Sequence, residues 1–441
     1  MMNSKANKRI GITMIILLLA LVILIIHFSY SFLYLPSHNA QKIREKRMYS
    51  FQSLPESAQE GNYYDTNGHL LMEHGKANSS EAYSMAWLLG YYASDNNHEY
   101  KMGLRGNLVD YSYLHLNKQK VGASTFLTID SNLQNLAYKL LHNQEGSITV
   151  LDAKTGAIRA LASHSTFDFN INDLSTLTKQ TAENSQFTRG LFEKDPPGST
   201  FKIITSISAL EQENIPNLNF KDTGSYLSKD RGAKIINFEN KAYGNVGLEK
   251  ALNHSINTYF AHLGEELGPT ALEKTAKKFL IGQDIPIPYL STLHSKLDVQ
   301  GANELAATAY GQGKTQITPV HLALIAQSLA NKGIMKEAYI VESIQSDQNI
   351  LYKHQEKDLS KVTESAVIEK LNPYLRSTAK LYGLKGEVYA KTGTAELPDK
   401  TTHIYLLAYT KDYGICLSLN HKNQSNRLIP LANRLLQYLQ K

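Results

Sequence analysis

The feature that most constrains this chain is a loop rich in proline and glycine that leads directly into an apolar helix. Residues 195–202 have the sequence Asp-Pro-Pro-Gly-Ser-Thr-Phe-Lys, which indicates the end of a loop and the start of a helix. Ser199 and Lys202 are three residues apart and therefore share one face of the first turn. A lysine can take the proton of a serine held this way, so the pair predicts an activated nucleophile. The helix should be buried, because apolar residues recur at helical spacing: Phe201, Ile203, Ile204, Ile207 and Leu210.

Ser-x-x-Lys alone is weak evidence, because Ser377 and Lys380 have the same spacing and are expected on an ordinary exposed helical turn. Two further motifs follow Ser199 along the chain, Ser255-Ile256-Asn257 and Lys391-Thr392-Gly393-Thr394. Ser-x-Asn is common, but Lys-Thr-Gly on a strand is more informative, because glycine lets a substrate or another backbone come close. The three motifs in this order predict one catalytic site.

Composition excludes several other classes of function. The chain has 441 residues and 42% hydrophobic content, enough for a large core. Its net charge of +6 is scattered, without a basic tract interleaved with aromatics, so we expect no nucleic-acid binding. The single cysteine, Cys416, excludes an intramolecular disulfide and is expected to be a small buried residue in a strand. His164, His254 and His262 lack metal-ligand spacing, so no metal site is expected.

A long apolar segment near the N-terminus predicts a membrane helix. Residues 10–35 contain no Asp, Glu, Lys or Arg, and as a helix they would cover about 39 Å, more than the roughly 30 Å of a hydrocarbon core. The competing interpretation is a signal peptide cleaved near Ser31, but the apolar run is long for that role, and we favour an uncleaved anchor. Basic residues flank both ends, so charge alone does not fix the orientation. Residues 1–9 are too few to fold.

The predicted strands lie towards both ends of the remaining chain, with helices between them. This pattern indicates an α/β (α+β) domain whose sheet is completed by the two chain ends. Asn67-Gly68 predicts a hairpin turn, whereas residues 216–246 are polar and carry no predicted element. Strands are predicted over residues 125–130, 147–151, 157–161, 387–391, 403–410 and 413–419. Helices are predicted after an Asp130 cap, after Ser199, over much of residues 248–332, and over residues 428–440.

These motifs resemble those of class B penicillin-binding proteins, which are monofunctional cell-wall transpeptidases. The resemblance covers roughly residues 125–420 and, more loosely, residues 61–68. One departure is Gly103-Leu104-Arg105, where family members often have Gly-Leu-Glu, and the N-terminal module is short. The resemblance also rests on Leu127–Asp130, Gly156–Ser163, Phe167–Asn170, Gly311-Gln312-Gly313 with Thr318-Pro319, and Lys391–Glu396.

The resemblance implies the penicillin-binding transpeptidase fold, an antiparallel sheet flanked by helices, with a small N-terminal module and one N-terminal transmembrane helix. It divides the chain into a cytoplasmic tail (1–9), an anchor (10–35), a short pedestal module (36–125) and a transpeptidase domain (126–441). The catalytic domain would lie outside the cytoplasm on a single-pass anchor in the cell membrane.

The resemblance also implies a role for each motif residue in proton transfer. Ser199 would attack the carbonyl between two terminal D-alanines of a peptidoglycan stem peptide, and β-lactams would acylate it instead. Lys202 would be the base, which requires its pKa to fall from about 10.4 towards the working pH. The charge of Lys391 and the helix N-terminus both lower that pKa. Ser255 would relay the proton to the departing amine.

The remaining motif residues would bind the substrate. Asn257 would hold the substrate amide, and the backbone N–H groups of Ser199 and Thr394 would form the oxyanion hole. Lys391 and the hydroxyls within Thr392-Gly393-Thr394 suit the terminal carboxylate. No cofactor is implied.

Alternatives remain within and outside this enzyme class. A D,D-carboxypeptidase, a membrane-bound β-lactamase and a β-lactam sensor share the motifs, although a sensor would need an output domain that residues 1–9 cannot supply. A bifunctional enzyme would need a glycosyltransferase domain, for which residues 36–125 are too few. A non-catalytic activator of a glycan polymerase would not need Lys202 or Lys391. The resemblance further implies a polytopic SEDS-type polymerase as partner, contacted through residues 10–35 and 48–125.

Overall fold

The computed structural model describes residues 58–440, except for residues 79, 95–98, 143, 164–187, 213–217, 231, 348 and 423. The predicted tail and anchor, His164 and the motif at residues 167–170 therefore lie outside the described residues. Among the residues that are described, no helix has both the length and the apolar composition needed to cross a membrane.

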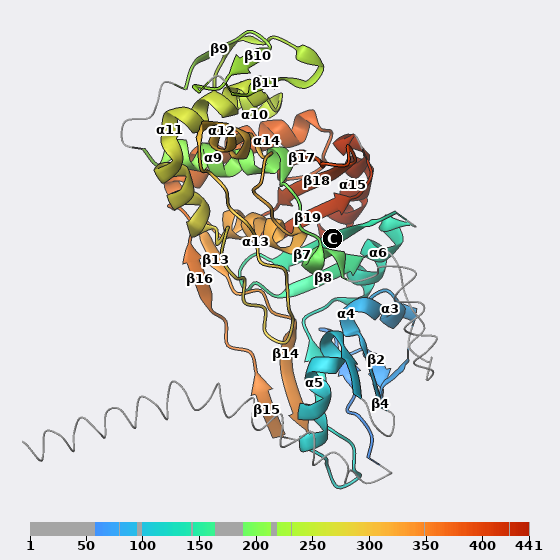
Figure 1. The fold of residues 1–441 in the computed structure, drawn as a ribbon. Helices are drawn as coiled ribbons and strands as arrows, with labels where there is room; N and C mark the ends of the chain where they lie inside the picture. The colour runs from blue at the N-terminus through green and yellow to red at the C-terminus, as the bar shows by residue number, and fades with distance from the viewer. Residues whose placement is uncertain are drawn as a thin grey trace, which may run out of the picture. The chain divides into compact units, whose positions relative to one another are not determined.

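A five-stranded antiparallel sheet forms the centre of the fold (Figure 1). Its strand order is β17-β18-β19-β7-β8, so strands from the C-terminal part of the chain pair directly with strands that precede Ser199. This pairing confirms the predicted α/β architecture, in which both ends of the domain complete one sheet. The strands are β7 (Gly146–Asp152), β8 (Ile158–Ser163), β17 (Tyr389–Glu396), β18 (Thr402–Tyr409) and β19 (Tyr413–Leu419).

Helices cover both faces of this sheet because its central strands are apolar on both sides. Along β18, Ile404 and Leu406 pack into one core with α6 (Ser131–Leu141) and α15 (Leu428–Leu439). The alternate residues Tyr405 and Leu407 pack into the second core, which contains α13 (Pro319–Ala330) and α8 (Arg189–Phe192). This period of two is the pattern of a strand buried between two layers.

The helix predicted after Ser199 is present and lies deep in the larger core. A 3₁₀ turn, η3 (Gly198–Phe201), continues into α9 (Lys202–Leu210), so Ser199 lies in the first turn, as predicted, but with 3₁₀ rather than α geometry. Every residue of α9 is buried. The surrounding helices are α10 (Leu248–Asn253), α11 (Asn257–Lys278), α12 (Ala302–Tyr310) and α14 (Ser365–Leu381).

The polar stretch left without a predicted element forms two small antiparallel pairs beside α11 (Figure 1). β10 (Ser225–Leu227) pairs with β11 (Lys234–Ile236), and β9 (Phe220–Asp222) pairs with β12 (Gly244–Val246). A 3₁₀ turn, η4 (Phe238–Asn240), joins the two pairs. We call residues 220–246 the small-sheet lobe.

A second, six-stranded sheet lies in the N-terminal part and has the order β15-β14-β6-β1-β2-β3. The predicted turn at Asn67-Gly68 is confirmed, because β1 pairs antiparallel with β2 on either side of it. β14 and β15 come from much later in the chain, a return that the sequence did not predict. The strands are β1 (Tyr63–Tyr64), β2 (Leu70–Glu73), β3 (Lys76–Ala77), β6 (Ser124–Leu127), β14 (Val341–Ser346) and β15 (Asn349–Lys353).

Short elements complete the described chain. They are α3 (Ser80–Tyr83), α4 (Ala86–Leu89), β4 (Tyr91–Ser94), β5 (Glu99–Met102), α5 (Gly103–Leu114), β13 (Ile334–Lys336), β16 (Asp358–Lys361) and η5 (Ser425–Arg427).

Candidate active site

Three chain segments meet at the turn that carries Ser199. Gly198 has φ of +56°, and a Cβ there would lie 2.6 Å from the backbone nitrogen of Thr394 on β17. A Cβ on Gly311, which follows α12, would lie 1.6 Å from the carbonyl oxygen of Gly198. Only glycine allows this approach, so the Gly-Gln-Gly and Lys-Thr-Gly motifs both pack against the serine-bearing turn. Ser199 itself is half-buried.

Lys202 is completely buried directly behind this turn. Its Nζ donates to the carbonyl oxygen of Ser255 at 2.7 Å and to Oδ1 of Asn257 at 2.7 Å, and lies 3.2 Å from Ser255 Oγ. Burial, and secondarily the charge of Lys391, hold the pKa of Lys202 well below its usual range. The fold therefore favours the neutral amine that the sequence predicted.

Lys391 lies on the other side of the same serine hydroxyl and is also completely buried. Its Nζ donates to Ser255 Oγ at 3.0 Å, to the hydroxyl of Tyr382 at 3.0 Å and to the carbonyl oxygen of Thr392 at 3.1 Å. These three acceptors match the three N–H groups of an ammonium. Ser255 Oγ therefore lies between two amines that the chain separates by almost 190 residues.

Ser255 reaches this position through an unusual backbone conformation. Its φ is +53°, in the left-handed region, which is uncommon for a residue other than glycine. It lies between α10 and α11, where its N–H bonds the carbonyl oxygen of Leu252 and the next N–H bonds that of Ala251. Ending α10 in this way lets the Ser255 carbonyl and hydroxyl both face Lys202.

β17 places the Lys-Thr-Gly motif at the edge of the five-stranded sheet. A Cβ on Gly393 would lie 2.7 Å from the carbonyl oxygen of Pro197 and 3.3 Å from the backbone nitrogen of Ser199. The backbone of β17 thus runs against the turn whose N–H groups were predicted to bind an oxyanion. All the predicted site residues are consequently gathered around one turn: Ser199, Lys202, Ser255, Asn257, Lys391, Thr392, Gly393 and Thr394.

Two residues that the sequence did not single out for the site contact it directly. Tyr382, at the end of α14, accepts the hydrogen bond from Lys391 and places its ring 5.7 Å from the same Nζ. Gln312 donates from Nε2 to the carbonyl oxygen of Thr394 at 3.0 Å, which explains one function of the Gly-Gln-Gly motif. Tyr382 carries no local sequence signal, because only the fold brings α14 beside β17.

Ser377, which has the same Ser-x-x-Lys spacing as Ser199 but was not expected to be catalytic, lies on a helix, α14, as predicted. The helical turn that carries it is not fully exposed. Ser377 is half-buried and its Oγ accepts a hydrogen bond from Nδ2 of Asn253 at 3.1 Å, and the neighbouring Thr378 is buried. The exposed setting predicted for this turn is therefore wrong, because α14 packs against α10 there.

Two minor expectations concern residues outside the site. Cys416 is completely buried on β19, as predicted, and burial raises the pKa of its thiol. His254 stacks on Tyr243, and His262 stacks on Phe220.

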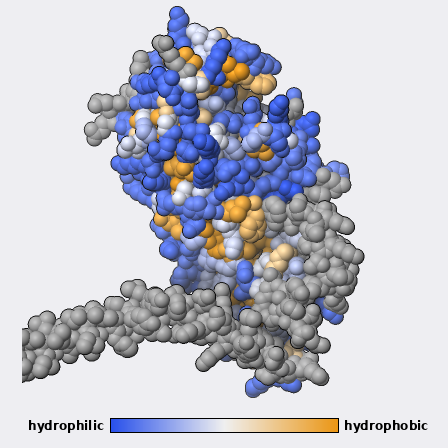
Figure 2. All heavy atoms as spheres, viewed as in Figure 1, coloured by the Kyte–Doolittle hydropathy of each residue, from blue (hydrophilic) through white to orange (hydrophobic). Residues whose placement is uncertain are grey.

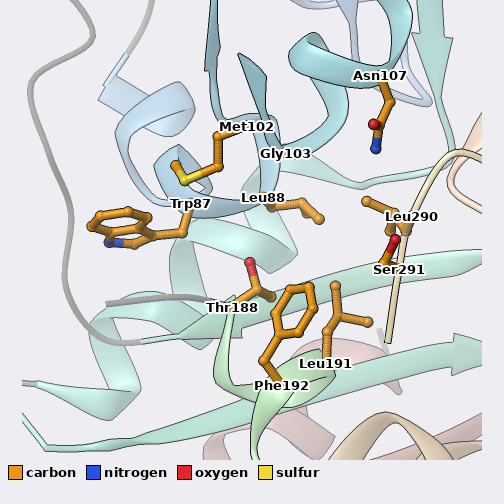
Figure 3. Close-up of a pocket in the computed structure, with 10 residues that line it drawn as sticks. All are labelled: Trp87, Leu88, Met102, Gly103, Asn107, Thr188, Leu191, Phe192, Leu290 and Ser291. Carbon is orange, nitrogen blue, oxygen red and sulfur yellow. The ribbon is translucent and has the colours of Figure 1, made fainter. Parts of the chain in front are cut away.

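An apolar pocket of about 500 Å³ lies away from these residues (Figure 3). Leu88 of α4 lies opposite Leu191 and Phe192 of α8 across it, with Trp87 towards one end and Leu290 towards the other. None of the predicted site residues lines it. Among the described residues, this pocket is therefore separate from the predicted site at the Ser199 turn.

Comparison with solved structures supports the fold. The crystal structure of PBPA from Mycobacterium tuberculosis superimposes with a TM-score of 0.78 at 21% identity, covering 87% of this chain and 100% of that one. The penicillin G acyl-enzyme complex of penicillin-binding protein A from the same organism gives the same score and identity.

Curated relatives share part of their length with this chain. Peptidoglycan D,D-transpeptidase PbpA of Mycolicibacterium smegmatis is 27% identical over 301 residues, which are 62% of this chain and 61% of the relative. Penicillin-binding protein 3 of Bacillus subtilis is 28% identical over 303 residues, 64% of this chain and 44% of the relative. Residues 146–425 match the family described as Penicillin binding protein transpeptidase domain. The match covers more than half of the chain and includes every motif residue described above, so this chain belongs to the penicillin-binding protein transpeptidase family.

Proposed function

We propose that this protein is a peptidoglycan D,D-transpeptidase of class B that works through an acyl-enzyme on Ser199 and is acylated there by β-lactams. The observation that carries the proposal is the buried amine of Lys202, bonded to Ser255 and Asn257 and placed one turn from Ser199. The names of the curated relatives favour the same activity, among them the peptidoglycan D,D-transpeptidases PbpA of Mycolicibacterium smegmatis and MrdA of Haemophilus influenzae.

In the proposed first step, Ser199 Oγ attacks the carbonyl carbon between the two terminal D-alanines and gives its proton to Lys202. A neutral lysine has two N–H groups, which the Ser255 carbonyl and Asn257 Oδ1 occupy, so its lone pair is left for a hydroxyl, either that of Ser255 at 3.2 Å or, in this step, that of Ser199. The Ser199 and Thr394 N–H groups stabilise the tetrahedral oxyanion.

The leaving group then takes a proton through Ser255, whose Oγ lies 3.2 Å from Lys202 and 3.0 Å from Lys391. The C–N bond breaks, D-alanine departs as an amine, and an ester joins the donor to Ser199. An amine of a neighbouring stem peptide attacks this ester, loses its proton, and restores the Ser199 hydroxyl as the C–O bond breaks. Lys391 and the hydroxyls of Thr392 and Thr394 bind the terminal carboxylate of the donor.

Labelling with a fluorescent penicillin tests the nucleophile. Ser199→Ala should abolish the label, whereas Ser377→Ala, a serine with the same Ser-x-x-Lys spacing, should keep it. Lys202→Arg preserves charge but cannot become neutral, so acylation should fall by about 10² or more. Label that persists on Ser199→Ala would overturn the assignment. Release of free D-alanine without a cross-linked product would instead favour a D,D-carboxypeptidase.

We further propose the segment division into tail (1–9), anchor (10–35), pedestal module (36–125) and transpeptidase domain (126–441), with the domain outside the cytoplasm. The charge-free run in residues 10–35 supports the anchor. A reporter that is active only outside the membrane, fused after residue 441, should be active and should sediment with membranes. Activity in the soluble fraction would favour cleavage near Ser31.

A polytopic SEDS-type glycan polymerase is the proposed partner. The apolar segment is longer than a span requires, and Tyr30, Phe32 and Tyr34 cluster at one end, where aromatic rings can pack on another helix. Replacing residues 10–35 with an unrelated spanning helix should leave penicillin labelling intact while weakening co-purification of the polymerase. If co-purification is unchanged, residues 10–35 are an anchor only.

A further inference from the structure

The hairpin of β10 and β11 in the small-sheet lobe has one packed face and one apolar exposed face. On the packed face, Ile235 is buried and the Tyr226 hydroxyl donates to Glu265 of α11 at 2.5 Å. Leu227 and Ile236 point the other way and are 50% and 49% exposed, and Phe238, just beyond β11, is 80% exposed. Three of the eight large hydrophobic side chains exposed in the described chain lie here, and we call these three the rim patch. Figure 2 shows apolar colour among polar colour on this lobe.

The backbone around the rim patch is held in place by a buried polar network. Asn237, 3% exposed, donates from Nδ2 to Asp222 Oδ2 at 2.9 Å and to the carbonyl oxygen of Lys241 at 3.0 Å. Glu239 and Asn240, which follow Phe238, both have left-handed φ values of 55° and 54°. Two such residues in succession cost free energy that the network must offset. The turn thus holds Phe238 in an exposed position near Leu227 and Ile236, and a group of exposed apolar side chains is typical of a recognition surface.

The backbone that carries the rim patch is hydrogen-bonded to a residue of the candidate active site. The carbonyl oxygen of Ile236 accepts a hydrogen bond from Nδ2 of Asn257 at 3.2 Å, and Oδ1 of Asn237 accepts one from the backbone N–H of Thr258 at 3.1 Å. The same Asn257 side chain contacts Lys202 through its oxygen. A substrate that lies against Asn257 and is longer than the reacting dipeptide can thus continue onto the rim patch.

The charges beside the patch suit an acidic peptide. Lys234, opposite Leu227 in the hairpin, and Lys241 are both exposed, and Lys241 Nζ lies 5.2 Å from the ring centroid of Tyr243. Glu239 is the exposed acidic residue between them. A peptidoglycan stem peptide combines short apolar side chains with the free carboxylate of its γ-linked D-glutamate, so it complements an apolar surface flanked by two ammonium groups.

We propose that the rim patch is a subsite for the part of the donor stem peptide that precedes the terminal D-Ala-D-Ala, with Phe238 as its main contact. The proposal rests on the proposed transpeptidase function and deepens it. It makes Phe238 a specificity-determining residue for long donors and irrelevant to the chemistry at Ser199.

Two synthetic donors test the proposal. Both end in the same D-alanyl thioester; one carries only an N-acetyl group before it, and the other carries the full L-Ala-γ-D-Glu-diamino acid segment. In the full-length protein, Phe238→Ala should lower kcat/KM for the long donor about tenfold, mainly through KM, because an apolar contact discriminates by roughly this factor. The short donor and the penicillin acylation rate should be unchanged, and Phe238→Leu should be intermediate.

Ile350→Ala is the matched control, because Ile350 on β15 is 61% exposed and belongs to the N-terminal sheet. This variant should leave kcat/KM unchanged for both donors. If Phe238→Ala lowers kcat/KM equally for both donors, or does not lower it for the long donor, the proposed subsite is wrong. If the wild-type protein neither binds penicillin nor turns over the short donor, the proposed function fails instead, so the two failures are distinguishable.

Discussion

At the scale of single residues, Ser255 is where the most constraints meet. Its carbonyl and hydroxyl both contact Lys202, its hydroxyl also contacts Lys391, and its backbone is left-handed. A left-handed residue other than glycine costs roughly 1–2 kcal/mol. Glycine would relieve that strain without supplying a hydroxyl, so we infer that the hydroxyl is the reason for a serine here.

The buried pair of lysines predicts a pH dependence with a definite sign. Because the pKa of Lys202 is depressed in the folded protein, the unfolded chain holds this proton more tightly, and between the two pKa values the free energy of unfolding rises with pH. Acylation needs the neutral amine and should also rise with pH through the folded pKa. Lys391→Met removes the second cause of the depression but not burial, so the rising limb of the penicillin acylation rate should move to higher pH. An unmoved limb would show that Lys391 does not tune Lys202.

Tyr382 is expected to position Lys391. Tyr382→Phe keeps the ring beside the ammonium but removes the acceptor that lies 3.0 Å from Nζ. A hydrogen bond to a charged group contributes about 1.5–3 kcal/mol, so the second-order acylation rate should fall tenfold or more. Tyr374→Phe, on the same helix, is the control. A purely structural role would lower the melting temperature and leave the rate and its pH profile unchanged.

At the scale of elements, sequence patterns predicted helices and strands correctly where the conformation is decided by residues close together in the chain. The Asp130 cap is confirmed, because its carboxylate accepts from the N–H groups of Asn132 and Leu133. The strands of residues 220–246 were missed, because each has only three residues and their positions depend on the buried Asp222–Asn237 contact. Tyr382 was missed because no local pattern links the end of α14 to Lys391, and only the tertiary fold brings them together.

Arg105 stands where family members often have Glu, and the structure shows an ion-pair partner for it that the sequence alone did not reveal. Arg105 of α5 forms a buried ion pair with Glu60, with 2.8 Å between Nη2 and Oε2, and a Cβ on Gly75 would lie 2.7 Å from the same Nη2. Arg105→Glu would bury two facing carboxylates and should cost about 3–5 kcal/mol.

The double variant Glu60→Arg with Arg105→Glu restores opposite charges and should recover most of the loss. Thermal unfolding of the four proteins in this cycle measures the coupling. Additive losses in the double variant would show that the pair is not coupled. Arg376→Glu, which breaks the exposed pair with Glu387, is the control and should change stability little.

At the scale of the whole molecule, the motifs predicted the members of the site but not the framework that joins them. Ser199, Lys202, Ser255, Asn257 and Lys391 could be named because each stands in a short recognisable pattern. The framework depends on contacts between distant segments, such as the pairing of β14 with β6 and the contact of Gly198 with Gly311. Such contacts produce no periodic pattern in the sequence. The central sheet was predicted because its strands are long and apolar.

That sheet also predicts how truncation acts. β19 lies between β18 and β7, so it joins the Lys-Thr-Gly strand to the part of the chain before Ser199. A protein ending at residue 410 retains every motif residue but leaves the edges of β18 and β7 unpaired and exposes the core that α15 covers. Deleting the buried side chains of Leu417, Leu419, Leu435 and Leu436 alone removes about 1.5–3 kcal/mol of burial each, comparable in sum to the stability of a typical domain.

The truncated protein should therefore be digested rapidly by protease and take no fluorescent penicillin. A matched protein lacking only residue 441 should be labelled like the full chain. If the protein ending at residue 410 is protease-resistant and still labelled at Ser199, the site does not depend on closure of the sheet by β19. Co-expression of residues 411–441 as a separate segment should restore labelling, because β19 pairs with its neighbours through backbone hydrogen bonds and apolar contacts that need no covalent link.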